Sequence, residues 1–268
     1  MQYHYKSHAK VNLFLKVLGK RSDGYHDIQS LFQLICLYDE ISFKIRKDNK
    51  INLKCNIKNL EKNNLIFKVI DKFKIQYRVC KIGLDIILKK NIPLGAGLGG
   101  GSSNAAITFL ALNDIYHKKI SKKSLCKSAL SLGADIPFFI NNKNAWVEGK
   151  GEIITNIYLK PLWIIIIFAS HEISTAEIYA NYKISGLVKK YTYDDYMDGT
   201  AVNVFEKIVS YRYPNIKKSL KILSKFGHAK MTGTGGSVFV EFKSYEEASD
   251  SLSQIPKSQN AIIIKSLI

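Results

Sequence analysis

The sequence lacks an apolar run long enough to cross a bilayer. Its longest run, LWIIIIFA, covers Leu162 to Ala169, whereas a membrane-spanning helix needs roughly 18–20 apolar residues. The first ten residues, MQYHYKSHAK, contain no apolar signal core either. We therefore expect a cytoplasmic protein without a membrane partner, in which residues 162–169 form a buried strand.

Cysteine is scarce and is not spaced for metal binding. The four cysteines form no C-x-x-C pair and lie in apolar or mixed stretches, where a free cysteine behaves as a small hydrophobic residue. This pattern excludes a disulfide framework and a zinc site built on paired cysteines. The residues are Cys36, Cys55, Cys80 and Cys126.

Acidic residues are also few, with 22 Asp and Glu against 40 Lys and Arg and a formal net charge of +18. Such a balance requires a polyanionic partner to be considered. The lysines, however, are spread through nearly every segment beside Ile and Asn instead of gathering in one basic run. We therefore favour a compositional bias and expect no nucleic-acid partner; a non-catalytic nucleic-acid binder stays the alternative from another class.

The first half of the chain mixes extended and helical patterns. Apolar residues alternate between Val11 and Val17, and residues 31–45 continue as strand after the turn RSDGYH. Helical spacing begins after Asn64, a candidate helix cap, and strand alternation returns in KIGLDIILKK, residues 81–90. A helix follows the glycine-rich stretch, and another over residues 121–132 is expected to end at Gly133 as a left-handed cap. Pro137 biases its predecessor toward an extended conformation, which places Asp135 in a connection.

The second half is expected to open on the strand WIIIIFA and to contain helices over residues 201–211 and 216–226. The loop MTGTGG then feeds the strand SVFVEF, SYEE has capping-box spacing at the head of a last helix, and NAIIIKSLI closes as a strand. We see no internal repeat. The fold class expected is α+β in two domains, residues 1–160 and 161–268.

The glycine-rich stretch IPLGAGLGGGSS, residues 92–103, lacks a lysine. A Walker loop needs lysine directly after its second glycine, and counting from Gly95 that position is Gly101. The dinucleotide fingerprint G-x-G-x-x-G is formally matched, but the preceding strand does not open an alternating parallel series, and the acid at a suitable distance, Asp114, lies at the end of the following helix. Both named nucleotide motifs are therefore disfavoured.

The physics that these motifs share still applies. Successive glycines let backbone N–H groups crowd round an anion, and the start of a helix adds partial positive charge. Ser102, Ser103 and Asn104 add side-chain donors at that helix start. An ordinary turn would be an entropically costly use of so many glycines, so the stretch predicts an anion-binding loop.

PLGAGLGGGSSNAA resembles the phosphate-binding motif of the GHMP kinases. Four further blocks resemble the branch of that family that phosphorylates cytidine-diphosphate methylerythritol: AKVNLFLKVLGKRSDGYHDIQSLFQLI, GADIPFF, NVFEKIV with the following YPNI, and MTGTGGSVFVEF. They run in the family's order from Ala9 to Phe242. The resemblance therefore covers most of the chain.

This resemblance implies a two-domain GHMP kinase fold, with an N-terminal ATP domain like domain 2 of ribosomal protein S5 and a C-terminal ferredoxin-like domain. It implies a small-molecule kinase that uses ATP and Mg²⁺ and is a monomer or homodimer. Its substrate would be cytidine-diphosphate methylerythritol, phosphorylated on the 2-hydroxyl. The rival within the family is a kinase for homoserine, mevalonate or a sugar, which would not need the aromatic residues of GYH.

The resemblance also assigns residues. Asp135 matches the catalytic aspartate, acting either as a base or as an orienting group for the substrate hydroxyl, and Lys10 matches its partner lysine. Either Ser102 or Ser103 is expected to help position magnesium, with no metal ligand firmly assigned. Tyr25 and Tyr179 would enclose the cytosine while His26 reads its polar edge, and Asn12 and Thr175 would bind the erythritol and phosphate portions. The ATP-binding positions implied are Asn64, near the adenine, and Pro93, Leu94, Gly95, Ala96, Gly97, Leu98, Gly99, Gly100, Gly101, Ser102 and Ser103 at the phosphates.

Overall fold

The computed structural model describes residues 2–79, 81–169, 173–184 and 188–268. The chain forms two compact units, each assembled from several segments. Unit 1 comprises residues 1–9, 37–92 and 99–142, and unit 2 comprises residues 10–36, 93–98 and 143–268. Neither unit follows the domain division expected near residue 160, which stays a prediction.

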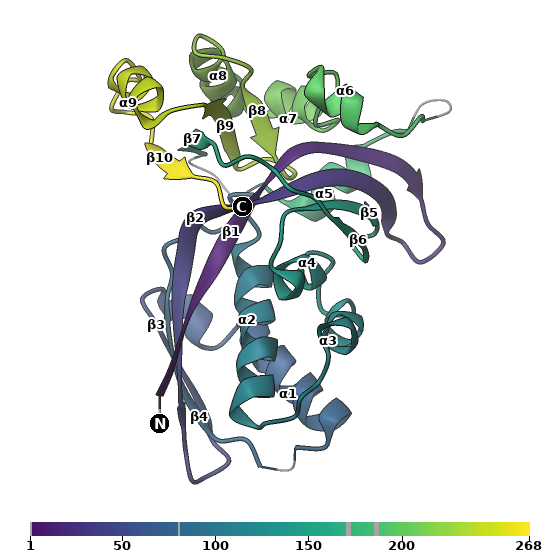
Figure 1. The fold of residues 1–268 in the computed structure, drawn as a ribbon, viewed down its shortest axis with the longest axis vertical. Helices are drawn as coiled ribbons and strands as arrows, with labels where there is room; N and C mark the ends of the chain where they lie inside the picture. Colours follow the sequence, from purple (N-terminus) through teal and green to yellow (C-terminus); the bar gives the residue numbers. More distant parts are fainter. Residues whose placement is uncertain (1, 80, 170–172, 185–187) are drawn as a thin grey trace. The chain divides into compact units, whose positions relative to one another are not determined.

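Two long strands, β1 (Gln2–Lys20) and β2 (His26–Ile45), each contribute residues to both units. In unit 1, β2 pairs antiparallel with β4, Ile41 opposite Leu88, and β4 pairs parallel with β3, Leu53 opposite Ile86. The helices of unit 1 lie together beside these strands (Figure 1). The remaining elements of unit 1 are β3 (Ile51–Cys55), the 3₁₀ helix η1 (Lys58–Glu61), α1 (Leu65–Tyr77), β4 (Leu84–Lys89), α2 (Gly100–Ile115), α3 (Lys122–Ala129) and α4 (Ile136–Asn141).

Local sequence explains the start of α1 and the pleat of β4. The Asn64 side chain accepts a hydrogen bond from the backbone N–H of Ile66, as expected of a helix cap. The residues of α1 at helical spacing are buried, and so are the alternate residues of β4. These patterns confirm the helix and the strand read from the sequence. The buried residues are Ile66, Val69, Ile70 and Phe73 in α1 and Leu84, Ile86 and Leu88 in β4.

Two expectations for residues 121–141 are wrong. The helix α3 ends at Ala129, and Gly133 is not a left-handed cap: the cap is Leu130 in a right-handed conformation. A Cβ on Gly133 would lie 3.2 Å from Ile136, so this position is short of space instead. The segment IPFFIN forms α4, because proline in the first helical turn needs no N–H partner. The wrong expectation is the extended conformation of Ile136, which is helical; Asp135 itself lies in the connection, as expected, as the N-cap residue of this short helix.

Unit 2 contains an antiparallel sheet in the order β10-β7-β9-β8. With helices between β7 and β8 and between β9 and β10, this is the βαββαβ arrangement of a ferredoxin-like domain, as expected. The first half of β2 pairs with β5, and β5 pairs with β6. The other elements of unit 2 are β5 (Ala145–Gly149), β6 (Ile153–Asn156), β7 (Trp163–Phe168), α5 (Thr175–Asn181), α6 (Tyr193–Met197), α7 (Glu206–Arg212), α8 (Pro214–Leu223), β8 (Lys230–Thr232), β9 (Ser237–Phe242), α9 (Tyr245–Ser253) and β10 (Ala261–Lys265).

The core of unit 2 joins this sheet to its helices. Side chains of β7 and β9 pack with residues of α5, α7 and α8 and with the inner positions of β1 and β2. The helix predicted from residue 201 begins only at Glu206, since Asn203 uses its side chain to bind the N–H of Phe205. Throughout the described part of the chain, every helix is too short or too polar to span a membrane.

Candidate active site

The first part of the glycine stretch, residues 93–98, lies against the loop between β8 and β9 in unit 2. A Cβ on Gly97 would lie 2.8 Å from the carbonyl oxygen of Thr232 and closer still to that of Gly235. A Cβ on Gly236 would lie 2.7 Å from Ala96 Cα. Two backbones therefore meet without side chains between them, which is why both loops are glycine-rich.

Lys10 lies next to this pair of loops. Its backbone N–H donates to the carbonyl oxygen of Leu98 at 3.0 Å. Its ammonium donates to Asn12 Oδ1 and, at 3.3 Å, to the carbonyl oxygen of Gly97, and it lies 4.7 Å from the centre of the Phe32 ring. Lys10 is only 4% exposed. A buried ammonium held by oxygen acceptors is a fixed positive charge beside the glycine stretch.

Asn12 forms hydrogen bonds to three other residues of the protein. Its Oδ1 accepts from Lys10, its Nδ2 donates to Ser30 Oγ at 2.9 Å, and its backbone N–H donates to Thr232 Oγ1 at 2.9 Å. Asn12 is also buried. These contacts suit a residue that orients Lys10, and its expected contact with substrate stays a prediction.

The second part of the glycine stretch opens α2 in unit 1. Gly99 is the cap residue with φ of 72°, a conformation that favours glycine. A Cβ on Gly101 would meet nothing within 4 Å, so the backbone is open to an approaching group there. Ser102 lies beside the segment that leads to Asp135, because its Oγ is 3.8 Å from a Cβ placed on Gly133. Ser103, in contrast, is buried and accepts a hydrogen bond from Ser7 Oγ at 2.7 Å.

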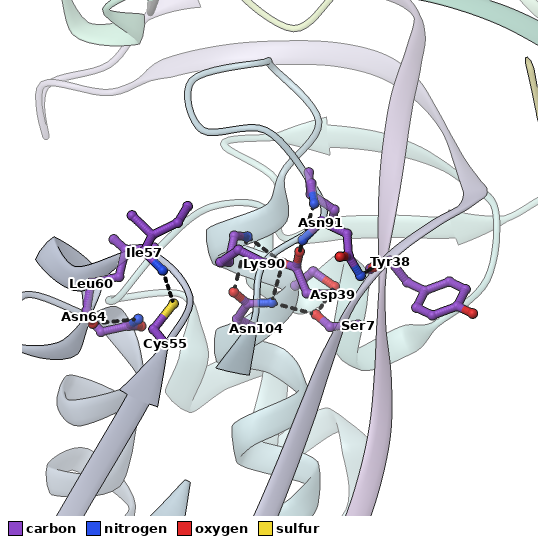
Figure 2. A network of polar contacts seen from close by, with 12 residues as sticks. Ser7, Tyr38, Asp39, Cys55, Ile57, Leu60, Asn64, Lys90, Asn91 and Asn104 are labelled. Carbon is purple, nitrogen blue, oxygen red and sulfur yellow. Dashed lines mark hydrogen bonds and ion pairs between the residues drawn. The ribbon is translucent and has the colours of Figure 1, made fainter. Parts of the chain in front are cut away.

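A buried polar network, seen in Figure 2, underlies the head of α2. Asp39 Oδ1 accepts from the backbone N–H groups of Asn91 and Ile92, both at 2.8 Å, while Oδ2 binds the Lys90 ammonium and accepts from Asn104 Nδ2 at 2.8 Å. Sequence reasoning missed Asp39 and Lys90, because a single acid and a single lysine in so basic a chain look like solvated surface groups.

Asn64 lies in unit 1 at the start of α1, not at the start of α2. Its Oδ1 caps α1, and its Nδ2 donates to the carbonyl oxygen of Leu60 at 3.2 Å (Figure 2). Both the oxygen and the nitrogen of the Asn64 side-chain amide therefore form hydrogen bonds to the neighbouring backbone. Its expected place near the adenine stays a prediction.

The residues expected to bind the cytosine belong to unit 2. The rings of His26 and Tyr179 lie with centroids 5.0 Å apart and planes tilted by 37°, and Tyr179 also contacts Phe205 at 4.7 Å. Tyr25 is 50% exposed, with the Lys150 ammonium 4.8 Å from its ring centre. His26 and Tyr179 therefore come together, and Tyr25 presents an open aromatic ring.

Burial of the His26 ring, assisted by the positive charge of Lys20, lowers the pKa of His26 below its ordinary value of 6.5. The imidazole is then neutral at pH 7, with one nitrogen as donor and the other as acceptor. Such a ring has the hydrogen-bonding groups needed to read the polar edge of a base.

Thr175 begins α5 and is tied to the loop between β8 and β9. Its hydroxyl oxygen lies 2.9 Å from that of Thr234. The same loop is held by Asn203, whose Nδ2 donates to the carbonyl oxygens of Met231 and Gly233 at 2.9 and 2.8 Å. Asn203 lies in the block NVFEKIV, but its supporting role could not be read from the sequence.

Lys10 belongs to unit 2 and Asp135 to unit 1, so their pairing stays a prediction.

Of the four cysteines, Cys80 lies outside the described residues, and the other three are free thiols. No group of three or more His, Cys, Asp or Glu side chains that could hold a metal ion is found in the part of the chain that the structure describes.

Comparison with known families identifies this arrangement. The model of the GHMP kinases N terminal domain matches residues 64–143, and that of the GHMP kinases C terminal domain matches residues 193–260. A solved structure of 4-(cytidine 5'-diphospho)-2C-methyl-D-erythritol kinase superposes with a TM-score of 0.84 at 25% identity, covering 98% of this chain and 99% of the other. The Methanococcus jannaschii mevalonate kinase superposes with a TM-score of 0.67 at 17% identity, over 100% of this chain and 99% of the other, which shows the shared fold alone.

Sequence relatives are more similar still. The 4-diphosphocytidyl-2-C-methyl-D-erythritol kinase of Francisella tularensis subsp. holarctica (strain FTNF002-00 / FTA) is 42% identical over 88% of this chain and 86% of its own length. The kinase of the same name from Shewanella halifaxensis (strain HAW-EB4) is 36% identical over 96% of this chain and 91% of its own. The chain therefore belongs to the 4-diphosphocytidyl-2-C-methyl-D-erythritol kinase family of the GHMP kinases.

Proposed function

We propose that this protein transfers the γ-phosphoryl group of ATP to the 2-hydroxyl of 4-diphosphocytidyl-2-C-methyl-D-erythritol, a step of the non-mevalonate route to isoprenoid precursors. The observation that carries the proposal is the 42% identity, over 88% of the chain, to a relative named for this activity. ATP is the phosphate donor of GHMP kinases, and the glycine stretch supplies a site suited to its phosphates.

The phosphate site would be the start of α2. The first N–H groups of a helix have no partner within it, and they carry partial positive charge. Open space above Gly101 supports a close approach of phosphate oxygens to the backbone there. Residues 93–98 would also contribute to the phosphate site, and Gly97 has a packing task as well, since a Cβ there would meet the loop between β8 and β9.

Phosphoryl transfer depends mostly on positioning and on stabilising charge. Lys10 would neutralise charge on the transferring group, and its fixed, buried ammonium supports this role because little reorganisation is needed. Asp135 would orient the substrate hydroxyl or accept its proton. Asp135 is the N-cap residue of α4 and follows Gly133, whose added Cβ would lie 3.8 Å from Ser102 Oγ, and this supports a place for Asp135 near the proposed phosphate site.

Magnesium would be held at the same helix start. Mg²⁺ commonly takes one or two protein ligands and completes its shell with water and substrate phosphates, so it needs no cluster of three acids. Ser102 fits this requirement better than Ser103, because Ser103 Oγ is buried and bonded to Ser7 whereas Ser102 Oγ is half-buried near Gly133. The ion would neutralise phosphate charge during transfer.

The cytidine end of the substrate would lie at the aromatic residues of unit 2. An exposed ring at Tyr25 and a neutral imidazole at His26 support stacking and edge recognition of a base. Thr175 would bind the phosphate or erythritol portion from the start of α5. These groups favour the cytidine-linked substrate over homoserine, mevalonate or a sugar, none of which carries a base.

The proposal also includes the domain division, the cellular location and the oligomeric state. Residues 1–160 would carry the ATP site and residues 161–268 would close over the substrate. The protein would act in the cytoplasm, as a monomer or homodimer. Two polyanionic ligands suit the net charge of +18, although that charge is larger than they require.

The test is a phosphorus NMR assay with magnesium and ATP, using the cytidine-linked substrate, homoserine, mevalonate and galactose in separate tubes. A new phosphomonoester signal with ADP formation in the first tube alone is the expected result. Phosphorylation of another acceptor would support the proposed ATP site and contradict the proposed binding of cytosine. Silence in every tube, with active control enzymes, would return the nucleic-acid alternative, for which binding should fall steeply with salt.

A further inference from the structure

The network around Asp39 has a position that an ordinary buried ion pair does not explain. The chain leaves unit 1 after Ile92, contributes the loop of residues 93–98 to unit 2, and returns to unit 1 at Gly99. The two ends of this loop are neighbours, because a Cβ on Gly100 would lie 3.0 Å from Ile92 Cγ2 and 3.1 Å from Lys90 Nζ. The loop is therefore closed at its base within unit 1.

Asp39 bonds to both ends of that loop. Its Oδ1 accepts two successive backbone N–H groups, those of Asn91 and Ile92, at the entry. Its Oδ2 accepts from Asn104 Nδ2, on the first turns of α2, at the exit. One carboxylate thus sets the separation between the strand end and the helix start.

Lys90 and Ser7 complete the set of contacts. The Lys90 ammonium binds Asp39 and donates to Asn104 Oδ1 at 3.4 Å, so it neutralises the carboxylate and holds the same amide from its other side. Ser7 accepts from Asn104 at 2.9 Å and donates to Ser103. Asp39 is 0% exposed and Lys90 7%. The side chains of this network, drawn in Figure 2, come from β1 (Ser7), β2 (Asp39), the residue after β4 (Lys90) and α2 (Asn104).

We propose that Asp39, with Lys90 and Asn104, is a positioning group for ATP: it holds the glycine loop in the shape that binds the phosphates. This inference rests on the proposed function, since the phosphate site is part of it. The physical reason is preorganisation, because a loop that is already ordered loses less conformational entropy when the anion binds. A buried ion pair by itself is weak evidence of stabilisation, so a role in the site explains its location better.

The test compares three variants with the wild type. Asp39→Asn keeps an oxygen for the entry N–H groups but places an NH₂ group against the donors of Lys90 and Asn104. Asn104→Ala removes the amide contacts with Asp39, Lys90 and Ser7 but keeps the carboxylate and its contacts at the entry of the loop, so it is the milder change. Asp85→Asn is the matched control, because it makes the same chemical change at an ion pair of the same unit, with Arg46 at 2.8 Å, away from the loop.

The readouts are the dissociation constant of a non-hydrolysable ATP analogue by calorimetry, the two KM values, and the melting temperature. We expect Asp39→Asn and Asn104→Ala to weaken binding of the analogue and raise the KM for ATP by about tenfold, with the KM for the cytidine-linked substrate within about twofold. Asp85→Asn should leave all three unchanged.

A purely structural role would lower the melting temperature and the amount of active protein without changing the affinity of the folded fraction for ATP, and that outcome would overturn the proposal. If Asp39→Asn does not fold, Asn104→Ala decides: unchanged affinity in that folded variant also overturns it. Calorimetry needs no acceptor. A failure of the wild type to phosphorylate the cytidine-linked substrate would therefore overturn the proposed function and leave the positioning role to be decided by the binding data.

Discussion

The glycines of the loop divide into two groups, and substitution by alanine should separate them. Gly97 has φ of +73°, and its added Cβ would lie 2.8 Å from the carbonyl oxygen of Thr232. A left-handed backbone costs a residue with a side chain about 1–2 kcal/mol. The obstructing atoms are backbone atoms that cannot rotate away, so the loops must move apart. We expect Gly97→Ala to lose about 3–5 kcal/mol of unfolding free energy, in the range of severe substitutions.

Two other glycines supply matched controls. Gly24 has φ of +84° but nothing within 4 Å of its added Cβ, so Gly24→Ala isolates the backbone cost of about 1–2 kcal/mol. Gly101 has neither a positive φ nor a close neighbour. Because it lies in a helix, where alanine is favoured over glycine by about 1 kcal/mol, Gly101→Ala should be as stable as the wild type or slightly more so.

The assay is urea unfolding at 25 °C together with the KM for ATP. Gly101→Ala should raise that KM at least about tenfold, because its methyl group occupies the space proposed for the phosphates. The reasoning fails if Gly97→Ala loses no more stability than Gly24→Ala, which would mean that residues 97 and 232–236 are not in close contact. An unchanged KM for ATP in Gly101→Ala would remove the backbone of Gly101 from the phosphate site.

Three further predictions concern the reacting groups and the base. Asp135→Asn should lower kcat by about 10²–10⁴ and leave the KM for ATP unchanged, and a steady-state assay with normal turnover would exclude Asp135 from the mechanism. Tyr25→Ala should raise the KM for the cytidine-linked substrate roughly tenfold without changing the melting temperature, because this ring is half exposed; equal KM values would refute stacking on it. Since folding lowers the pKa of His26, the folded protein binds fewer protons than the unfolded chain below pH 6.5, and stability should fall as the pH drops through that value. Urea midpoints between pH 8 and 5.5 should fall less steeply in His26→Gln, and identical slopes would contradict this.

Local elements with a single strong signal were predictable from the sequence. Asn64 followed by apolar residues at helical spacing specified α1, and the alternation from Leu84 to Leu88 specified β4. Residues 136–141 were not predictable in the same way, because the proline at position 137 has two opposite meanings: it disfavours helix for the residue before it, yet it is well suited to a first helical turn. Packing of α4 against α2 and α3 decides between them.

The network around Asp39 could not be predicted from the sequence, for a different reason. Asp39 and Asn104 are 65 positions apart, and Asp39 and Lys90 are 51 apart. Pairings at such separations leave no local pattern, and one lysine among 40 Lys and Arg gives no sign that it is buried. In contrast, residues joined by a short motif, such as Lys10 and Asn12, could be named from the sequence, although their mutual hydrogen bond could not.

The missing lysine of the glycine loop now has a structural account. In a Walker loop the lysine is part of the loop itself, whereas here the corresponding position is Gly101, where a side chain would close off open space above the backbone. The cation beside residues 93–98 is supplied instead by β1, whose Lys10 ammonium is anchored by Asn12 and by the carbonyl oxygen of Gly97. Because a strand carries this cation, no position of the loop has to be a lysine. The loop can therefore use its glycines to pack against residues 231–236 and, under the proposed function, to offer N–H groups to the phosphates. Under the proposed function, substitutions in the loop should therefore change the affinity for ATP, and substitutions at Lys10 should change the rate of transfer.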